Sequence, residues 1–179
     1  MMIYELKNGK RLSIRRAQER DAKELVEMYN KLGMESDNLT FGVDDYYLNV
    51  DQEKNLIYNL NNRDNCIYLV ALIDGKIVGN LTFIASQRKR LMHRGEMGIA
   101  VLKDYWNLGI GNSLMDYFFK WVQSTEKIKK VELQVREDNI AAINLYLKWG
   151  FKFEGKISKG IMVNGKYYDL YYMGRTIGW

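Results

Sequence analysis

Residues 96–115, EMGIAVLKDYWNLGIGNSLM, decide the fold, because they join an apolar strand pattern to an amphipathic helix through a loop containing Gly109 and Gly111. The apolar residues that follow keep helical spacing: Ile110, Leu114, Met115, Phe118 and Val122. The first backbone N–H groups of such a helix have no partner inside it, and the helix dipole adds partial positive charge. Glycine lets an anion approach that backbone closely. The loop therefore predicts either a phosphate-binding site or simply a tight turn.

Two common phosphate loops are excluded by the residues that are missing. The stretch lacks both the lysine of a Walker loop and the third glycine of a dinucleotide-binding fingerprint. A phosphate bound here would be held by backbone N–H groups between about Leu108 and Ser113.

Composition indicates an ordinary globular protein. The chain has 179 residues, of which 47% are hydrophobic and 27% charged, and we expect one domain spanning residues 1–179. The net charge of +5 suits an anionic ligand, but the basic residues form no long tract, so no nucleic-acid partner is expected. No apolar run approaches the roughly 18 residues that span a bilayer. We therefore expect no membrane association and a cytoplasmic location.

The single cysteine and the single histidine predict neither a disulfide nor a metal site. Cys66 begins the apolar run CIYLVALI, which favours a small buried core residue over a nucleophile. His93, next to Arg94, is more typical of a surface residue than of a general base.

The remaining patterns predict the order β-α-α-β-β-β-α-β-α-β-β. Helix 21–33 would begin with Asp21 as N-cap, use Glu24 as its capping-box partner and stop at Gly33. Asp-Gly at 74–75 and Asn-Gly at 164–165 predict two hairpins. The other expected elements are strands 11–17, 66–73, 76–85, 93–102 and 129–135, two long final strands, and helices near 51–62, from 110 and over 138–150. We expect an α/β fold of the mixed α+β kind, with about seven mostly antiparallel strands and about four helices on both faces of the sheet.

The span 96–115, followed by VELQVREDNIAAINLYLKWGFKFEG at 131–155, resembles the GNAT superfamily of acetyl-CoA-dependent N-acetyltransferases. The first block is similar to the family's coenzyme A motif, Q/R-x-x-G-x-G/A, with Trp106 at the Q/R position. The second is similar to the strand and helix that follow it, with Asn139 opening the helix, Tyr146 seven residues later and a closing Gly-Phe. The resemblance covers roughly residues 10–175 and is nearest to polyamine and ribosomal-protein acetyltransferases.

This resemblance implies a GNAT fold with acetyl-CoA as cosubstrate and no metal. The pantetheine arm would pair with the backbone near Ile99 and Val101 like an added strand, and the pyrophosphate would bind the amides of the glycine loop. The cofactor-binding residues that the resemblance implies are Ile99, Ala100, Val101, Trp106, Asn107, Leu108, Gly109, Ile110, Gly111, Asn112, Ser113, Asn139 and Tyr146.

Two catalytic residues follow from the same resemblance. Tyr146 would protonate the leaving thiolate, because a tyrosine with a pKa near ~10 is a poor base but a competent acid toward a thiolate. The alternative for Tyr146 is a core aromatic one turn from Ile143. Glu96 would be the general base, often acting through water, and its alternative is a solvent-facing strand carboxylate.

The acceptor is indicated only by segment 35–53, which has six acidic residues and no Lys or Arg. With Phe41, Tyr46 and Tyr47, it would form a wall that favours a cationic amine, unless it is a solvated loop. We expect acetyl transfer from acetyl-CoA to a primary amine by direct attack in a ternary complex, with a cationic small molecule as the favoured acceptor. The alternatives are a protein or peptide N-terminus and a non-catalytic CoA-binding or sensing domain. The tyrosine-rich end could pack in the sheet or form a homodimer.

Overall fold

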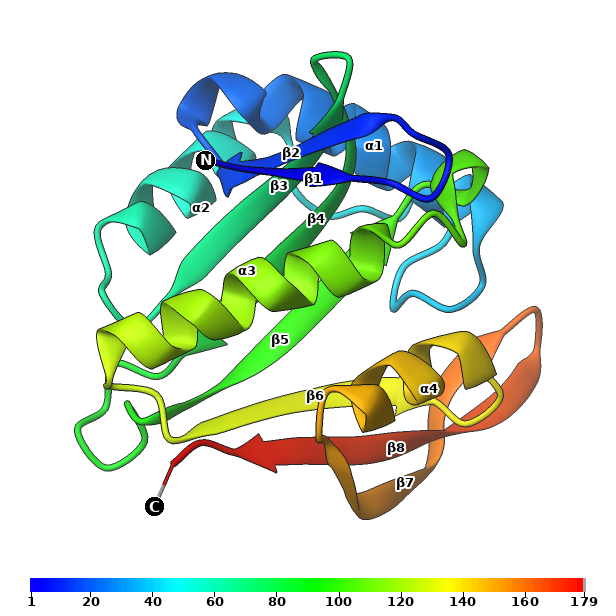
Figure 1. The fold of residues 1–179 in the computed structure, drawn as a ribbon. Helices are drawn as coiled ribbons and strands as arrows, with labels where there is room; N and C mark the ends of the chain where they lie inside the picture. Colours follow the sequence, from blue (N-terminus) through cyan, green and yellow to red (C-terminus); the bar gives the residue numbers. More distant parts are fainter. Residues whose placement is uncertain (179) are drawn as a thin grey trace.

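The computed structural model describes residues 1–178 as one eight-stranded sheet flanked by four α-helices (Figure 1). The strands are β1 Met2–Glu5, β2 Arg11–Arg16, β3 Ile67–Ile73, β4 Lys76–Ala85, β5 Arg94–Val101, β6 Lys130–Arg136, β7 Lys152–Val163 and β8 Lys166–Thr176. The helices are α1 Ala22–Glu35, α2 Val50–Asn61, α3 Ile110–Thr125 and α4 Ile140–Lys148. Short 3₁₀ turns cover Glu19–Asp21 and Lys103–Tyr105.

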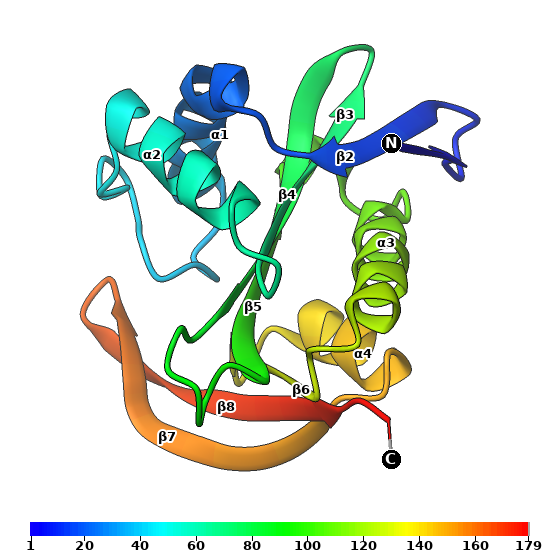
Figure 2. The same cartoon turned by 90° about the vertical axis from the view of Figure 1, so that its left-hand side faces the viewer.

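The sheet is mixed, with the strand order β1-β2-β3-β4-β5-β6-β8-β7. Strands β1 to β5 form an antiparallel meander, β6 joins β5 in parallel, and β8 lies between β6 and β7. Helices α1 and α2 cover one face, whereas α3 and α4 cover the other (Figure 2). The mixed, mostly antiparallel sheet with helices on both faces confirms the predicted fold class.

Hydrophobic burial explains the centre of the sheet. All seven residues of β3 are buried, because helices cover both of its faces. The two predicted hairpins are confirmed, since Asp74, Gly75, Asn164 and Gly165 all adopt the positive φ that tight two-residue turns require. Cys66 is completely buried in the core, as predicted, and His93 is exposed.

The strand count was one too low. Strand β1 is only four residues long and alternates between half-buried and exposed positions at the edge of the sheet. Such a short edge strand carries little hydrophobic pattern, and its pairing with β2 comes from the chain reversing through residues 6–10.

Asp21 occupies the N-cap position of the first helix, as predicted, but the predicted capping contacts and the predicted end of the helix were wrong. The Asp21 side chain makes no capping hydrogen bond to α1 and pairs with Arg15 at 2.6 Å, while Glu24 accepts a hydrogen bond from the Ile77 amide at 2.7 Å. The helix also passes through Gly33 and ends at Glu35. A Cβ at Gly33 would lie 2.3 Å from the carbonyl oxygen of Gly42, so this glycine permits a close approach by the loop after the helix.

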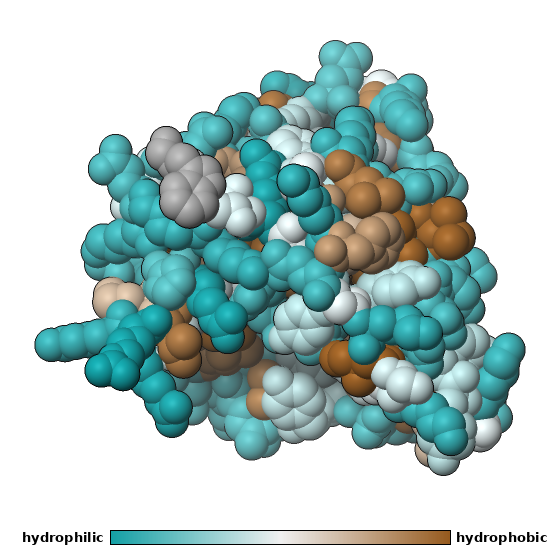
Figure 3. Space-filling model, turned by 90° about the horizontal axis from the view of Figure 1, so that it is seen from below, coloured by the Kyte–Doolittle hydropathy of each residue, from teal (hydrophilic) through white to brown (hydrophobic). Residues whose placement is uncertain are grey.

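The outer edge of the sheet is β7, seen from below in Figure 3. Apolar side chains on this side are separated by hydrophilic ones, and Phe153, Met162 and Tyr167 are each at least half exposed. The homodimer stays a prediction.

Candidate active site

Strands β5 and β6 diverge after a short parallel contact, as Figure 1 shows. Their pairing ends at Glu96 and Glu132, beyond which β5 continues to Val101 paired only with β4. The His93 carbonyl accepts from Lys129 on the β6 side, and the Leu102 amide donates to Val78 on the β4 side. Peptide groups point alternately to the two sides of a strand. Those of Met97, Ile99 and Val101 therefore point away from β4, toward a side where no strand within residues 1–178 pairs with this part of β5. This unpaired edge contains the residues predicted to pair with the pantetheine arm.

Trp106 occupies part of that edge from within the protein. Its indole N–H donates to the carbonyl oxygen of Val101 at 2.7 Å, which ties the loop before α3 to the end of β5. The Val101 carbonyl therefore already has a donor, while the backbone groups of Ile99 remain on the open side. The indole N–H of Trp106 is committed to this internal contact, and cofactor binding by Trp106 stays a prediction.

The glycine loop presents a group of free amides at the start of α3. Asn107 and Gly109 adopt positive φ angles of 62° and 96° and turn the chain sharply into the helix. The amides of Ile110, Gly111 and Asn112 are the first three of the helix and have no acceptor inside it. The amide of Ser113 already donates to the Gly109 carbonyl at 3.1 Å, and its hydroxyl donates to the same oxygen at 3.3 Å. Ser113 therefore contributes less to an anion site than the sequence suggested.

Helix α4 packs against this loop and brings the two sequence motifs together. The Trp149 indole donates to Asn112 Oδ1 at 3.2 Å, and the rings of Trp149 and Phe119 stack at 5.6 Å. Asn139 caps α4 by accepting from the Ala142 amide at 3.3 Å. Asp138, the residue before it, pairs with Arg136 at 2.6 Å. The structure thus confirms that Asn139 opens and caps α4, and its contact with the cofactor stays a prediction.

Tyr146 lies on the buried side of α4, with 6% of its surface exposed and its ring 5.8 Å from that of Phe151. Burial raises the pKa of its phenol, so the hydroxyl is protonated at neutral pH. The hydroxyl has no hydrogen-bond partner among residues 1–178, and it is not one of the fully buried atoms that lack a partner, so the oxygen itself reaches the surface. A protonated, unengaged donor suits a general acid, and this role stays a prediction.

Glu96 lies on the other face of β5, exposed and beside Glu132 in the β5–β6 register. Partial desolvation and the negative charge of Glu132 raise the pKa of its carboxyl. The nearby cations are engaged elsewhere, since Arg94 pairs with Glu132 at 3.1 Å and Lys130 pairs with Glu154 at 2.8 Å. A carboxylate with a raised pKa accepts a proton more readily, as a general base requires.

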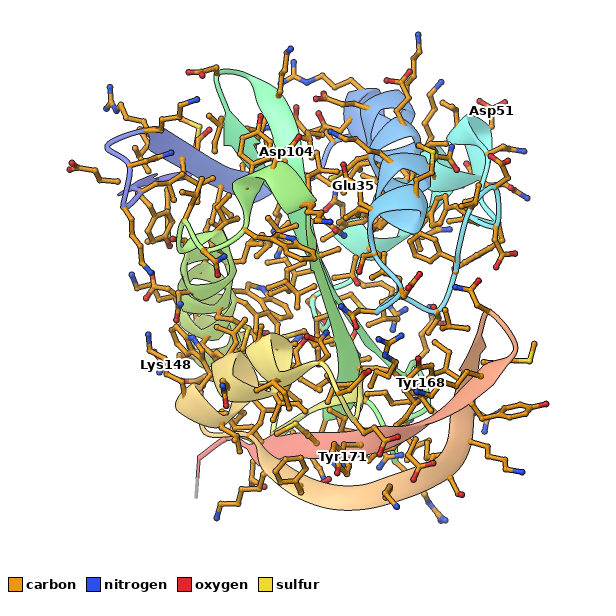
Figure 4. All side chains as sticks on the ribbon, turned by 90° about the vertical axis from the view of Figure 1, so that its right-hand side faces the viewer. Glu35, Asp51, Asp104, Lys148, Tyr168 and Tyr171 are labelled. Atoms are coloured by element: carbon orange, nitrogen blue, oxygen red, sulfur yellow. The ribbon has the colours of Figure 1, made fainter. Side chains whose placement is uncertain are left out.

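The acidic segment 35–53 is less open than the sequence suggested. Glu35 pairs with Lys31 at 3.3 Å and accepts from the Lys103 amide at 3.0 Å, and Figure 4 shows it close to Asp104. Phe41 and Tyr46 pack on the ring of Tyr29, at 5.8 and 4.3 Å between centroids. Asp37, Asp44 and Asp45 remain exposed, so any wall that attracts cations consists mainly of these three.

A buried polar network beneath this segment was missed by the sequence analysis. The carboxyl oxygens of Glu53 accept hydrogen bonds from Tyr68 at 2.7 Å and Tyr46 at 2.8 Å. The Tyr68 and Tyr29 hydroxyls lie 2.9 Å apart, and Asn80 donates to Tyr29 at 2.5 Å. The available signal was the position of Glu53 on the same helical stripe as Ile57 and Leu60 of α2, where an apolar residue is the norm.

Residues 1–178 contain no group of three acidic, histidine or cysteine side chains able to hold a metal ion. None of the helices in that range is long and apolar enough to cross a membrane.

Comparison with known proteins identifies relatives of this chain. The family model described as "Acetyltransferase (GNAT) family" matches residues 34–151. An L-amino acid N-acetyltransferase of Escherichia coli is 39% identical over 117 residues, covering 65% of this chain and 72% of that protein. An N-alpha-acetyltransferase of Sulfurisphaera tokodaii is 30% identical over 185 residues, covering 99% of this chain and all of that protein.

Solved structures agree with these matches. A GNAT acetyltransferase from Streptococcus pneumoniae superposes with a TM-score of 0.89 at 36% identity, covering 93% of this chain and 99% of that one. A GNAT phosphinothricin acetyltransferase from Sinorhizobium meliloti, solved with acetyl-CoA, has a TM-score of 0.79 at 18% identity, with 93% and 89% coverage. The second likeness supports the fold alone.

Proposed function

Because this chain belongs to the GNAT acetyltransferase family and is an acetyl-CoA-dependent N-acetyltransferase, we propose that its acceptor is the α-amino group of an amino acid or of a peptide N-terminus. Two of the similar proteins, the Escherichia coli and Sulfurisphaera tokodaii enzymes, act by their names on amino acids and on α-amino groups. In both kinds of acceptor, the primary amine is on the carbon that bears a carbonyl group, so one kind of site can bind either of them. The sequence had favoured a cationic small molecule instead.

The observation that carries the donor side is the continuity between the unpaired β5 edge and the free amides of α3. Peptide groups of Ile99 face the open edge, and the amides of Ile110, Gly111 and Asn112 lie at the start of the helix that follows. A donor that joins an amide-containing arm to a diphosphate matches both features, the arm as an added strand and the diphosphate at the helix N-terminus.

We propose direct attack by the amine on the thioester. Glu96 takes the proton of the acceptor's ammonium group, directly or through water. The amine nitrogen then bonds to the acetyl carbon, the carbon–sulfur bond breaks, and Tyr146 gives its proton to the departing thiolate. The nitrogen loses its second proton as the amide forms, and this proton restores the Tyr146 phenol directly or through water, while Glu96 releases its proton to solvent. The protonated state of buried Tyr146 and the raised pKa of Glu96 support this division of roles.

Release of free thiol from acetyl-CoA across a panel of amines tests the proposal. The panel contains the free L-amino acids, short peptides with free N-termini, the same peptides N-acetylated, and spermidine. We expect release with free α-amines and none with the N-acetylated peptides, which differ only in the reacting group. Activity on spermidine alone would instead support the cationic acceptor, for which exposed Asp37, Asp44 and Asp45 are the structural argument. If no amine in the panel causes thiol release, the remaining interpretation is a CoA-binding domain without transferase activity.

A further inference from the structure

The network beneath the α1–α2 segment ends in an atom that has no partner. Asn80 is 3% exposed, and its Oδ1 is the one buried side-chain oxygen or nitrogen in the described part of the chain that lacks a hydrogen bond. A buried carbonyl without a donor is costly and therefore uncommon in a folded protein. A donor supplied by a bound molecule would relieve that cost.

The direction of the hydrogen bonds fixes which end of the Asn80 amide is free. The carboxyl oxygens of Glu53 accept from Tyr68, so the Tyr68 oxygen is left to accept from Tyr29. The Tyr29 oxygen then accepts from Asn80 Nδ2. Burial raises the pKa of both Tyr29 and Tyr68, which keeps their hydroxyls protonated as this order requires. Flipping the Asn80 amide would place two acceptors face to face, so Oδ1 must point away from the network.

Asn80 lies on the face of the sheet where the general base was predicted. It is opposite Ala100 in the β4–β5 ladder, and Glu96 is on the same face four residues earlier in β5. At about 3.3 Å per residue, the two side chains are separated by roughly 13 Å along the strand.

On β5, the floor between these two side chains carries little bulk, while β4 adds Thr82 opposite Gly98, with its hydroxyl on this face. The residue midway, Gly98, has no side chain and stays exposed in the middle of the sheet, and Ala100 is small and half-buried. This strip runs along the same β5 segment whose edge faces the predicted pantetheine position. An acceptor lying on it would have Glu96 at one end and Asn80 at the other.

We propose that Asn80 Oδ1 accepts a hydrogen bond from an N–H group of the acceptor substrate other than the reacting amine, such as a backbone N–H of a peptide, and that Tyr29, Tyr68 and Glu53 hold the Asn80 amide in the orientation that this contact needs. Asn80 is thus a specificity-determining residue, and the other three are positioning residues. Donation by Nδ2 into a chain that ends on a carboxyl group makes Oδ1 a stronger acceptor, because linked hydrogen bonds polarise one another. The inference rests on the proposed function, whose acceptor it places on this strip.

Steady-state kinetics of Asn80→Leu, with the panel peptide of highest kcat/KM and with acetyl-CoA, test the proposal. Leucine keeps the approximate size of the side chain and removes the carbonyl. For a peptide acceptor, we expect the KM to rise about 10-fold or more, as for leaving a donor of the bound substrate unpaired, with the acetyl-CoA KM within about twofold of wild type. Circular dichroism and thermal unfolding confirm that the variant is folded.

Tyr29→Phe separates orientation from simple structural support. It leaves Asn80 intact but frees its amide to turn, so the acceptor KM should rise, and it should rise no further when added to Asn80→Leu. Two independent structural defects would instead add. Tyr4→Phe is the matched control, because Tyr4 also donates to a carboxylate, Asp116 at 2.8 Å, but from β1 to α3. It should leave both KM values unchanged.

The outcomes separate the two proposals. No thiol release by the wild-type protein with any panel amine overturns the proposed function and this inference with it. Release by the wild type together with an unchanged acceptor KM in folded Asn80→Leu overturns the inference alone. A rise in the acetyl-CoA KM instead of the acceptor KM also overturns it, since Oδ1 would then serve the pantetheine arm.

Discussion

Tyr146 illustrates, at the scale of a residue, why burial and catalysis are compatible in one side chain. Its ring packs in the core beside Phe151, while its hydroxyl has no partner within residues 1–178. Tyr146→Phe should therefore fold with nearly unchanged thermal stability. We expect kcat to fall about 100-fold, as is typical for losing a general acid, with acetyl-CoA affinity retained. Calorimetry and thiol release measure the two effects, and an unchanged kcat would leave Tyr146 as a core aromatic only.

Glu96 is tested by the pH dependence of kcat/KM. A general base works only when deprotonated, so activity should fall as the pH drops through the pKa of Glu96. Because partial burial and Glu132 raise that pKa, this limb should lie above the usual glutamate range near ~4.3. Glu96→Gln should remove the limb and lower the rate, while Glu132→Gln should move it to lower pH. If the acidic limb of Glu96→Gln is identical to that of the wild-type protein, another group must be the general base.

Residue roles were predictable only where a short motif carries them. The roles predicted for Asn139 and Tyr146 follow from the resemblance of one helix to the family motif, whereas Asn80 and Glu53 come from different elements and meet through Tyr29 and Tyr68. Nothing in the local sequence around Asn80 shows that its neighbour in space is Tyr29, 51 residues earlier. The donor side of the candidate site could therefore be predicted from the sequence, whereas the proposal for the acceptor side required the fold.

At the scale of an element, the N-terminus of α3 should account for most of the diphosphate affinity. Gly111 contributes one of the three free amides, and a Cβ there would lie 3.1 Å from the flexible end of Leu145. Gly111→Glu adds a side chain and a negative charge where an anion should bind, so we expect acetyl-CoA affinity to fall about 100-fold or more in calorimetry.

A matched control separates that local effect from a change in total charge. Gln123→Glu makes the same charge change at the exposed far end of α3. It should leave acetyl-CoA affinity within about twofold of wild type. Equal affinities in folded Gly111→Glu and Gln123→Glu would show that the loop is only a tight turn.

Element boundaries were predicted well where turn chemistry is local and poorly where tertiary contacts decide. Asp74-Gly75 and Asn164-Gly165 form hairpins because the two residues themselves favour positive φ. Gly33 failed as a stop signal because its small size serves the contact with Gly42 instead. Glu24 failed as a capping residue because the amide of Ile77, on β4, is its partner.

At the scale of the whole molecule, divergence of β5 from β6 leaves the sheet incomplete at its centre. The strands pair only over Arg94–Glu96 and Lys130–Glu132, so the backbone of β5 beyond Glu96 needs another partner. A cofactor that supplies this partner and also binds α3 completes the sheet and links two elements of the fold. The donor should therefore act as part of the folded structure.

Acetyl-CoA should accordingly stabilise the protein against unfolding. At 100 times its dissociation constant, a ligand that binds only the folded state adds about 2.7 kcal/mol. For a chain of this size, that corresponds to a rise in Tm of roughly 5–10 °C. Hydrogen exchange should slow most at the amides of Ile99, Ile110, Gly111 and Asn112 and remain unchanged in the β1–β2 hairpin.

Pantetheine, which lacks the diphosphate, distinguishes protection of the β5 edge from protection of the N-terminus of α3. It should slow exchange at Ile99 without protecting the first amides of α3, because only the arm is present to complete the strand. Acetyl-CoA should protect both sets, since its diphosphate adds the contact at the helix N-terminus. Protection of α3 by pantetheine, or uniform slowing by acetyl-CoA throughout the chain, would contradict this division, and the site of cofactor binding would then lie away from the unpaired edge.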